Sequence, residues 1–213
     1  MIIKQVVVGM FEVCCYIVGC EKTRQCVLID PAGDEERVVS TAKDLGLEVK
    51  AIVNTHGHPD HTCGNKKIVA MTGVKILMHP LDDKYFSSPA GMAMARQFGL
   101  EPSPPADEHI QDGDRIEIGE TALKVIHTPG HTPGGVCLYG ENNLFTGDTL
   151  FVGAVGRTDL PGGSLDIMLQ SIKNKILTLP DKTVVWPGHD YGATPTSTVA
   201  KERKTNPYIT DFL

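Results

Sequence analysis

Short runs of β-branched and other apolar residues, broken by glycines and charged turns, occupy the first thirty residues. This pattern predicts three strands, at residues 6–8, 13–18 and 26–29. A helix is expected over residues 38–45, because apolar side chains recur there at helical spacing and Gly46 is a good stop signal. A short buried strand at 49–53 follows and leads into a polar loop. The alternation of strand and helix is typical of an α/β fold.

The second half of the chain repeats this pattern. Strands are predicted at residues 116–118, 122–126, 136–139, 144–146 and 183–186. Ser164 can cap a helix with one apolar face, and a last amphipathic helix is expected to begin near Thr196 or Ser197. Residues 81–99 are helix-like but contain a proline and a glycine, which predicts an irregular helical insertion near the site entrance. No linker is visible, so residues 1–213 are expected to form a single domain.

Composition and charge narrow the classes of partner. The chain has 20 Lys+Arg against 26 Asp+Glu, a formal charge of −6, which argues against nucleic acid. The amino terminus predicts a strand rather than a signal peptide, and no apolar run is long enough to span a bilayer. The six cysteines form no C-x-x-C pair and are expected to be small buried side chains rather than a disulfide framework. We therefore expect a cytoplasmic protein with neither a nucleic-acid nor a membrane partner.

Three histidines and an aspartate lie within six residues, in the segment from His56 to His61. Gly57 and Pro59 argue against a helix, so a tight loop is expected here. Imidazole nitrogen and carboxylate oxygen are ligands that suit Zn²⁺, Fe and Mn²⁺. His56 and His58 could chelate one ion, while Asp60 and His61 turn toward a second. Packing so many polar rings without a metal would leave donors unsatisfied or charges unpaired.

Further ligand candidates follow other predicted strands, each beside a glycine that lets the backbone bend toward a shared pocket. They are His131, Asp148 and His189. Five histidines and two aspartates would then provide about three ligands per ion with one shared carboxylate. The isolated His79 and His109 are expected to be surface or core residues. His127 precedes the loop of His131, and both a supporting role at the site and a structural role stay open.

The signature H-x-H-x-D-H, followed by a separate His, Asp and His, resembles the metallo-β-lactamase fold superfamily from about residue 10 onward. The resemblance implies a four-layer αβ/βα sandwich. It also implies one metal on His56, His58 and His131, a second on Asp60, His61 and His189, and Asp148 as the bridge. The stretches PGHTPG, GDT and PGHDYG look most like the glyoxalase II-like branch, the hydroxyacylglutathione hydrolases.

That branch implies a binuclear metallohydrolase with two divalent ions, Zn²⁺ in the first place and Fe or Mn²⁺ as alternatives. Metal coordination lowers the pKa of water to about 7, which provides a hydroxide to attack a small thioester such as a hydroxyacyl-glutathione. A thiolate leaves readily because the pKa of a thiol is only about 8.5. Asp148 would fix the spacing of the ions, and Asp60 would orient the metal-bound hydroxide.

Substrate contacts are less clearly marked. Tyr191 matches a tyrosine that glyoxalase II proteins use for glutathione, although a core position is an equal alternative. Where those proteins have a Lys-Phe-Tyr stretch, this chain has Arg157, which could clamp a substrate carboxylate or pair with Asp159 or Asp166 as scaffold. The separate C-terminal helical domain of that branch is expected to be absent, since 24 residues follow His189.

The same seven side chains are also compatible with other functions. Persulfide dioxygenases share the seven side chains but look to use one iron on two histidines and an aspartate, and the stretch at residues 156–159 is similar to theirs. That alternative would oxidise glutathione persulfide. An RNA-processing nuclease is disfavoured by the acidic charge, and a non-catalytic metal-binding protein by the complete ligand set. Homo-oligomerisation is left open.

Overall fold

The computed structural model describes residues 1–213 and has two six-stranded sheets packed face to face. The first sheet has the order β1 (Ile2–Val8), β2 (Val13–Gly19), β3 (Gln25–Ile29), β4 (Glu48–Val53), β5 (Lys75–Met78), β6 (Glu108–His109). The second has the order β14 (Ser197–Thr198), β13 (Val184–Pro187), β10 (Asn143–Gly147), β9 (Val136–Gly140), β8 (Thr121–His127), β7 (Arg115–Ile118). A separate hairpin pairs β11 (Leu150–Phe151) with β12 (Ala154–Val155).

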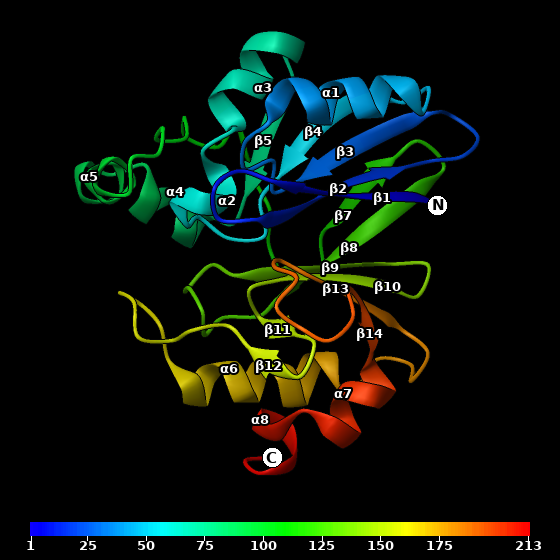
Figure 1. Ribbon diagram of the computed structural model, residues 1–213, viewed down its shortest axis with the longest axis vertical. Helices are drawn as coiled ribbons and strands as arrows, with labels where there is room; N and C mark the ends of the chain where they lie inside the picture. The colour runs from blue at the N-terminus through cyan, green and yellow to red at the C-terminus, as the bar shows by residue number, and fades with distance from the viewer.

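Helices cover the outer faces of both sheets (Figure 1). The helices of the first half are α1 (Glu35–Asp44), α2 (Pro59–Thr62), α3 (Asn65–Thr72), α4 (Pro80–Phe86) and α5 (Pro89–Gln97). Those of the second half are α6 (Leu165–Ser171), the π-helical turn η1 (Ile172–Ile176), α7 (Val199–Thr205) and α8 (Pro207–Thr210). With α1 and α3 above the first sheet and α6, α7 and α8 below the second, the molecule is the αβ/βα sandwich that the sequence predicted.

Strand β2 shows why the first sheet has uninterrupted apolar runs. All seven of its residues are buried. Tyr16 and Val18 point into the core between the two sheets, whereas Cys15 and Ile17 pack on the opposite face with side chains of α1 and α3. Alternate residues of a strand face opposite sides, so a sheet covered on both faces needs apolar side chains at every position.

Apolar side chains fill the outer layers in the same way. Val38 and Ala42 of α1 and Ile68 of α3 pack in one outer core. Met168 of α6 and Ile172 of η1 pack in the other, against the second sheet. The predicted helical faces of both halves are therefore confirmed.

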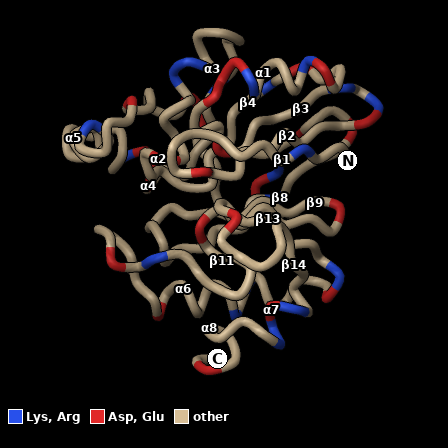
Figure 2. Tube along the Cα trace, in the orientation of Figure 1, with Lys and Arg blue, Asp and Glu red and all other residues tan.

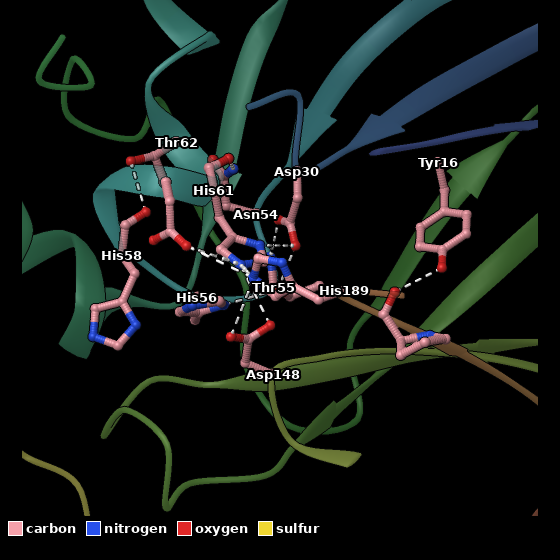
Figure 3. Close-up of polar contacts among 12 residues, drawn as sticks. Tyr16, Asp30, Asn54, Thr55, His56, His58, His61, Thr62, Asp148 and His189 are labelled. Carbon is pink, nitrogen blue, oxygen red and sulfur yellow. Dashed lines mark hydrogen bonds and ion pairs between the residues drawn. The ribbon is translucent and has the colours of Figure 1, made fainter. Parts of the chain in front are cut away.

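A single tyrosine connects the two sheets near the site. The hydroxyl of Tyr16, on β2, donates a hydrogen bond of 2.6 Å to the carbonyl oxygen of Pro187, at the end of β13 (Figure 3). The Tyr16 ring also packs against Phe145 and Trp186, with ring centroids 5.1 and 5.8 Å away. Together with the hydrogen bond of 2.8 Å from the Cys14 amide to the Gly188 carbonyl oxygen, this contact holds the chain where it leaves β13 toward His189.

Two local predictions were wrong. The segment expected to be a helix-free loop contains α2, with Pro59 at its first position. Proline suits that position because the first amide of a helix has no intrahelical acceptor. The last helix begins at Val199 rather than near residues 196–197, because the Thr198 hydroxyl caps it by accepting from the amide of Lys201 at 3.2 Å.

All six cysteines are free, and five of them are buried, as expected. None of the helices has the length and apolar character that a bilayer crossing requires.

Candidate metal centre

All seven predicted ligands gather at one end of the sandwich, beyond the carboxyl ends of four strands; Figure 3 labels five of them, His56, His58, His61, Asp148 and His189. His56 and His58 follow β4, and Asp60 and His61 lie in α2 directly after them. The other three lie just beyond β8, β10 and β13; they are His131, Asp148 and His189. Strands from both sheets end here, so residues far apart in the sequence become neighbours.

The first group consists of three buried histidines, His56, His58 and His131. One nitrogen of each ring lies within 4.8 Å of the others. The closest pair is His58 Nδ1 and His131 Nε2, at 2.8 Å. The centroid of the His56 ring is 4.9 Å from that of His58 and 4.7 Å from that of His131. Three imidazoles at these separations could hold one metal ion.

The second group consists of Asp60, His61 and His189, whose ligand atoms also lie within 4.8 Å of one another. His61 Nε2 is 3.3 Å from His189 Nε2 and 3.8 Å from Asp60 Oδ2. Asp60 is partly exposed, while both histidines are buried. This group could hold a second ion on two nitrogens and a carboxylate oxygen.

Asp148 lies between the two groups. Its Oδ1 is 3.3 Å from His61 Nε2, and its Oδ2 is 3.6 Å from His131 Nε2 and 3.7 Å from His189 Nε2. One carboxylate therefore faces histidines of both groups. This is the place that the resemblance assigned to a bridging ligand.

Hydrogen bonds fix the tautomers of two histidines. His131 Nδ1 donates to the carbonyl oxygen of Arg157 at 2.7 Å. His61 Nδ1 donates at 3.0 Å to Asp30, whose oxygens also accept from the amide and hydroxyl of Thr55. Since these acceptors cannot give up a proton, Nδ1 of each histidine carries a proton, which leaves Nε2 as the nitrogen available to a metal ion. Such hydrogen bonds orient imidazoles for a metal ion.

The ligand nitrogens and oxygens face one another as acceptors, an arrangement that a cation between them would stabilise. His61 Nε2 faces other acceptors, and His131 Nε2 lies against a ring nitrogen of His58. His56 Nε2 is buried without any hydrogen-bond partner. Buried polar atoms are normally satisfied, and convergent lone pairs repel unless a positive charge lies between them. The donor set therefore fits a divalent metal ion.

The electrostatics keep most of these ligands in the form that binds metal. Burial lowers the pKa of His58 to about 3, and burial together with the neighbouring histidines holds the pKa of His56 well below its usual value. Burial alone would raise the pKa of Asp148, but the adjacent His61 and other histidines outweigh it and lower that pKa. Burial opposes protonation of His61 too, yet Asp148 and Asp60 outweigh it and raise its pKa. The carboxylates thus attract a positive charge to this point.

The sequence reasoning missed Asp82, a fully buried carboxylate on α4. It accepts from the amide of Gly57 at 2.8 Å, from the hydroxyl of Thr132 at 2.7 Å and from the amide of Gly134 at 2.6 Å. Burial raises its pKa despite these donors. Asp82 thereby joins the loop of His56 and His58 to the loop of His131.

Asp30 was also missed, because a single aspartate after a predicted strand belongs to no motif. It ends β3 with a left-handed φ of 48°, which turns the backbone at the strand end. Its position could have indicated a role at the site. Asp30 follows the carboxyl end of β3, which pairs in parallel with β4, the strand that leads to the histidine loop.

The two predicted substrate contacts, Arg157 and Tyr191, both line a cavity of about 410 Å³ beside the metal groups. Arg157 pairs bidentately with Asp159, at 2.8 Å for both bonds, and not with Asp166. Tyr191 is 67% exposed and stacks on the His189 ring at 4.8 Å, so the core interpretation is wrong. Both side chains remain predicted contacts.

The three isolated histidines lie outside both metal groups. His109 pairs with Asp83 at 2.9 Å. His79 and His127 stack with centroids 4.3 Å apart. His127 Nε2 also donates to the carbonyl oxygen of Pro133, in the loop that follows His131.

The cavity has a volume of about 410 Å³, and five of the seven candidate ligands form its floor. Its walls include residues from the β1–β2 turn, the end of α5 and the β11–β12 hairpin, so the predicted position of the helical insertion near the entrance is confirmed. The remaining lining residues are Phe11, Pro59, Met94, Phe98, Leu100, Phe151, Ala154, Val155, Arg157, Leu160 and Tyr191.

Comparison with known proteins agrees with this geometry. The model of the metallo-beta-lactamase superfamily matches residues 9–189. The chain is 37% identical to the mitochondrial persulfide dioxygenase ETHE1 of Bos taurus, over 92% of this chain and 70% of that protein. The crystal structure of the BLEG-1 B3 metallo-beta-lactamase is 33% identical, with a TM-score of 0.88 over 98% of this chain and 100% of that one. TTHA1623 in a di-iron-bound form is also 33% identical, with a TM-score of 0.84 over 96% and 99%.

The family model spans most of the sequence, and the matched residues 9–189 include all seven predicted ligands. The chain belongs to the metallo-β-lactamase superfamily.

Proposed function

We propose that this protein is an iron-dependent persulfide dioxygenase. The observation that carries the proposal is its 37% identity to a persulfide dioxygenase over nearly the whole chain, together with a fully assembled set of histidine and aspartate side chains. The glyoxalase II-like branch, expected first from the sequence, has less support, because two relatives at 37% identity are persulfide dioxygenases, whereas a probable metallo-hydrolase of Bacillus subtilis is 34% identical. The reaction would convert a persulfide, dioxygen and water into a thiol, sulfite and two protons.

The residues around Asp148 suit an iron site. His131 Nε2 lies 3.6 Å from Asp148 Oδ2, and His56 presents its unpartnered Nε2 in the same group of rings. Two histidines and a carboxylate with open positions are typical of non-haem iron oxygenases. Bound iron would supply the redox chemistry with dioxygen that side chains lack.

The chain itself would position the persulfide and limit the access of water. Phe11, Phe98 and Phe151 line the cavity above the ligand floor. Burial keeps the pKa of His58 low, so this ring stays neutral and cannot act as an acid near neutral pH. Asp60 is the only partly exposed member of the second group, and it borders the cavity, where it could accept a proton from water or substrate.

Thioester hydrolysis is the second candidate, because the second group is complete. Asp60, His61 and His189 are assembled as fully as the first three histidines, and a similar structure holds two iron ions. A second ion would supply Lewis acidity and lower the pKa of water. Asp60 would then orient the attacking nucleophile toward a small thioester. In the dioxygenase candidate two histidines and Asp148 would hold one iron, whereas in the hydrolase candidate all seven side chains would act as ligands of two divalent metal ions.

Metal analysis beside two assays tests the proposal. The purified protein is analysed for iron, zinc and manganese per chain, then assayed for oxygen uptake on a panel of low-molecular-weight persulfides and for hydrolysis of hydroxyacyl-glutathione. We expect iron, oxygen uptake with one sulfite per dioxygen, and loss of both iron and oxygen uptake in Asp148→Ala. The exposed Asp211→Ala is the matched control and should retain both.

Two zinc ions per chain with thioester hydrolysis and no oxygen uptake would overturn the dioxygenase proposal in favour of the hydrolase. Full activity in Asp148→Ala with its metal retained would remove the basis of both candidates, since that carboxylate faces both groups.

A further inference from the structure

The cavity above the metal groups has an apolar wall and little positive charge. Seven large apolar or aromatic side chains line it: Phe11, Met94, Phe98, Leu100, Phe151, Leu160 and Tyr191. Several of them contact one another around the opening. Phe11 meets Phe98 edge to face, with centroids 6.4 Å apart, and Phe151 meets Tyr191 at 5.5 Å. The wall is continuous with the ligand floor, so a substrate that reaches the floor must pass along it.

Arg157 is the single Lys or Arg among the residues that line this cavity. Its guanidinium already makes two hydrogen bonds of 2.8 Å to Asp159, so the charge of the pair is locally balanced. Figure 2 shows most Lys and Arg positions on outer helices, hairpins and loops. The ligand floor adds two carboxylates, Asp60 and Asp148. An anionic carrier group therefore finds no free cation in the cavity other than the metal.

We infer that the thiol carrier of the substrate is apolar and uncharged, of the size of an alkyl or benzyl group, rather than a charged peptide such as glutathione. Glutathione has two carboxylates and an ammonium group, and burying these against phenylalanine and leucine side chains would leave them desolvated and unpaired. An apolar carrier would instead bury its own surface against the wall. The inference rests on the proposed function for the reacting group, a persulfide, but concerns the other end of the molecule.

The experiment compares two carriers on the metal-loaded protein. Oxygen uptake is measured with benzyl persulfide and with glutathione persulfide, and we expect kcat/KM to be higher for the benzyl compound by about tenfold or more. The acetyl thioesters of the same two thiols are assayed for hydrolysis. Benzyl methyl sulfide and S-methylglutathione, which do not react, are titrated by calorimetry. The thioester assays and the calorimetry measure the preference for one thiol carrier whether or not the protein oxidises persulfides.

A charge variant tests whether the wall sets the preference. Phe98 is 49% exposed at the rim, so Phe98→Lys should fold normally while adding a cation beside the opening. We expect this variant to shift the preference toward glutathione by about tenfold. Phe98→Leu keeps an apolar rim, and Phe212→Lys adds the same charge at an exposed position outside the cavity; both should keep the original preference.

The outcomes separate the two proposals. If neither persulfide gave oxygen uptake, the dioxygenase function would be overturned. Thioester hydrolysis and calorimetry would still show whether the protein prefers the benzyl or the glutathione compounds. Equal or better kcat/KM and binding for the glutathione compounds would overturn the apolar-carrier inference. An equal shift in Phe98→Lys and Phe212→Lys would overturn it as well, because the wall would then not determine selectivity.

Discussion

At the scale of single residues, the candidate site depends on side chains that are not metal ligands themselves but hold the ligands in place. His61 directs Nε2 toward the other ligands because Asp30 accepts its Nδ1 proton. The ligands themselves could be predicted, because H-x-H-x-D-H places several donors within six residues. Asp30 and Asp82 could not, because a lone aspartate carries no sign of which distant loop it will bond.

We expect Asp30→Asn to weaken metal binding at the second group. The new amide would donate toward His61 Nδ1, which would move the ring proton to Nε2 and block the lone pair. Loss of such a partner typically costs about 10–100-fold in affinity. Metal retained per chain during competition with a chelator measures the effect. Asp34→Asn, which changes an exposed aspartate, should retain the wild-type metal content; retention in Asp30→Asn too would contradict this role.

Gly188→Ala should displace Asp148. A Cβ at Gly188 would overlap the Oδ1 atom of Asp148 and the backbone of Gly147. The carboxylate faces both groups of histidines, so its movement should reduce metal content and activity together. Metal analysis and the melting temperature of the apoprotein distinguish this from unfolding. As a comparison, Gly73→Ala introduces a methyl group into open space, at a strained φ but far from the ligands. Normal metal content in Gly188→Ala would show that a methyl group at this position does not displace Asp148.

At the scale of elements, the site depends on how strands end and helices begin. Most strands were predicted within a few residues, because strands buried on both faces leave uninterrupted apolar runs. The helix α2 was missed, since Pro59 was interpreted as a helix breaker when it starts the helix. That helix places His61 toward Asp148, while the bend and loop between β4 and α2 hold His56 and His58.

Helix α4 contributes the carboxylate that joins two loops, so Asp82→Ala should loosen both. Three donors would lose their acceptor, namely the amides of Gly57 and Gly134 and the hydroxyl of Thr132. Hydrogen bonds to a charged group contribute about 1.5–3 kcal/mol each, so we expect a loss of stability of several kcal/mol at most and faster metal release. Denaturant unfolding of the metal-loaded protein measures the first effect, and metal release measures the second.

Asp83→Ala is the neighbouring comparison for this prediction. Asp83 also lies on α4, but it contacts Ala106 and His109 away from the ligands. The Asp83→Ala variant should therefore release metal at the wild-type rate. If Asp82→Ala and Asp83→Ala released metal at the same rate, Asp82 would have no special connection with the ligand loops.

At the scale of the whole molecule, the two halves of the sandwich meet at the site. The general architecture followed from the order of strands and helices and from the family resemblance, whereas the packing of one sheet on the other could not be derived from sequence pattern. Tyr16 is an example: it lies within an apolar run of β2, and no neighbouring residue indicates that its hydroxyl reaches Pro187 in the other sheet.

We expect Tyr16→Phe to keep the fold but lower its stability. The ring packing on Phe145 and Trp186 would remain, while the Pro187 carbonyl would lose its donor. A buried acceptor without a partner costs about 1–3 kcal/mol. The midpoint of urea unfolding, compared with that of the exposed Tyr208→Phe, checks the effect. An unchanged midpoint would mean that the carbonyl finds another donor.

The separation of the ligands along the chain determines when a metal can first be held firmly. His58 and His131 are 73 residues apart, and His61 and His189 are 128 residues apart. While the protein is being synthesised, the histidine loop emerges from the ribosome long before its partners. An ion that meets the nascent chain then finds only the ligands of this loop and can exchange freely. The metal content of the finished enzyme should therefore reflect which ion the cell supplies after His189 has been made, rather than which ion arrives first.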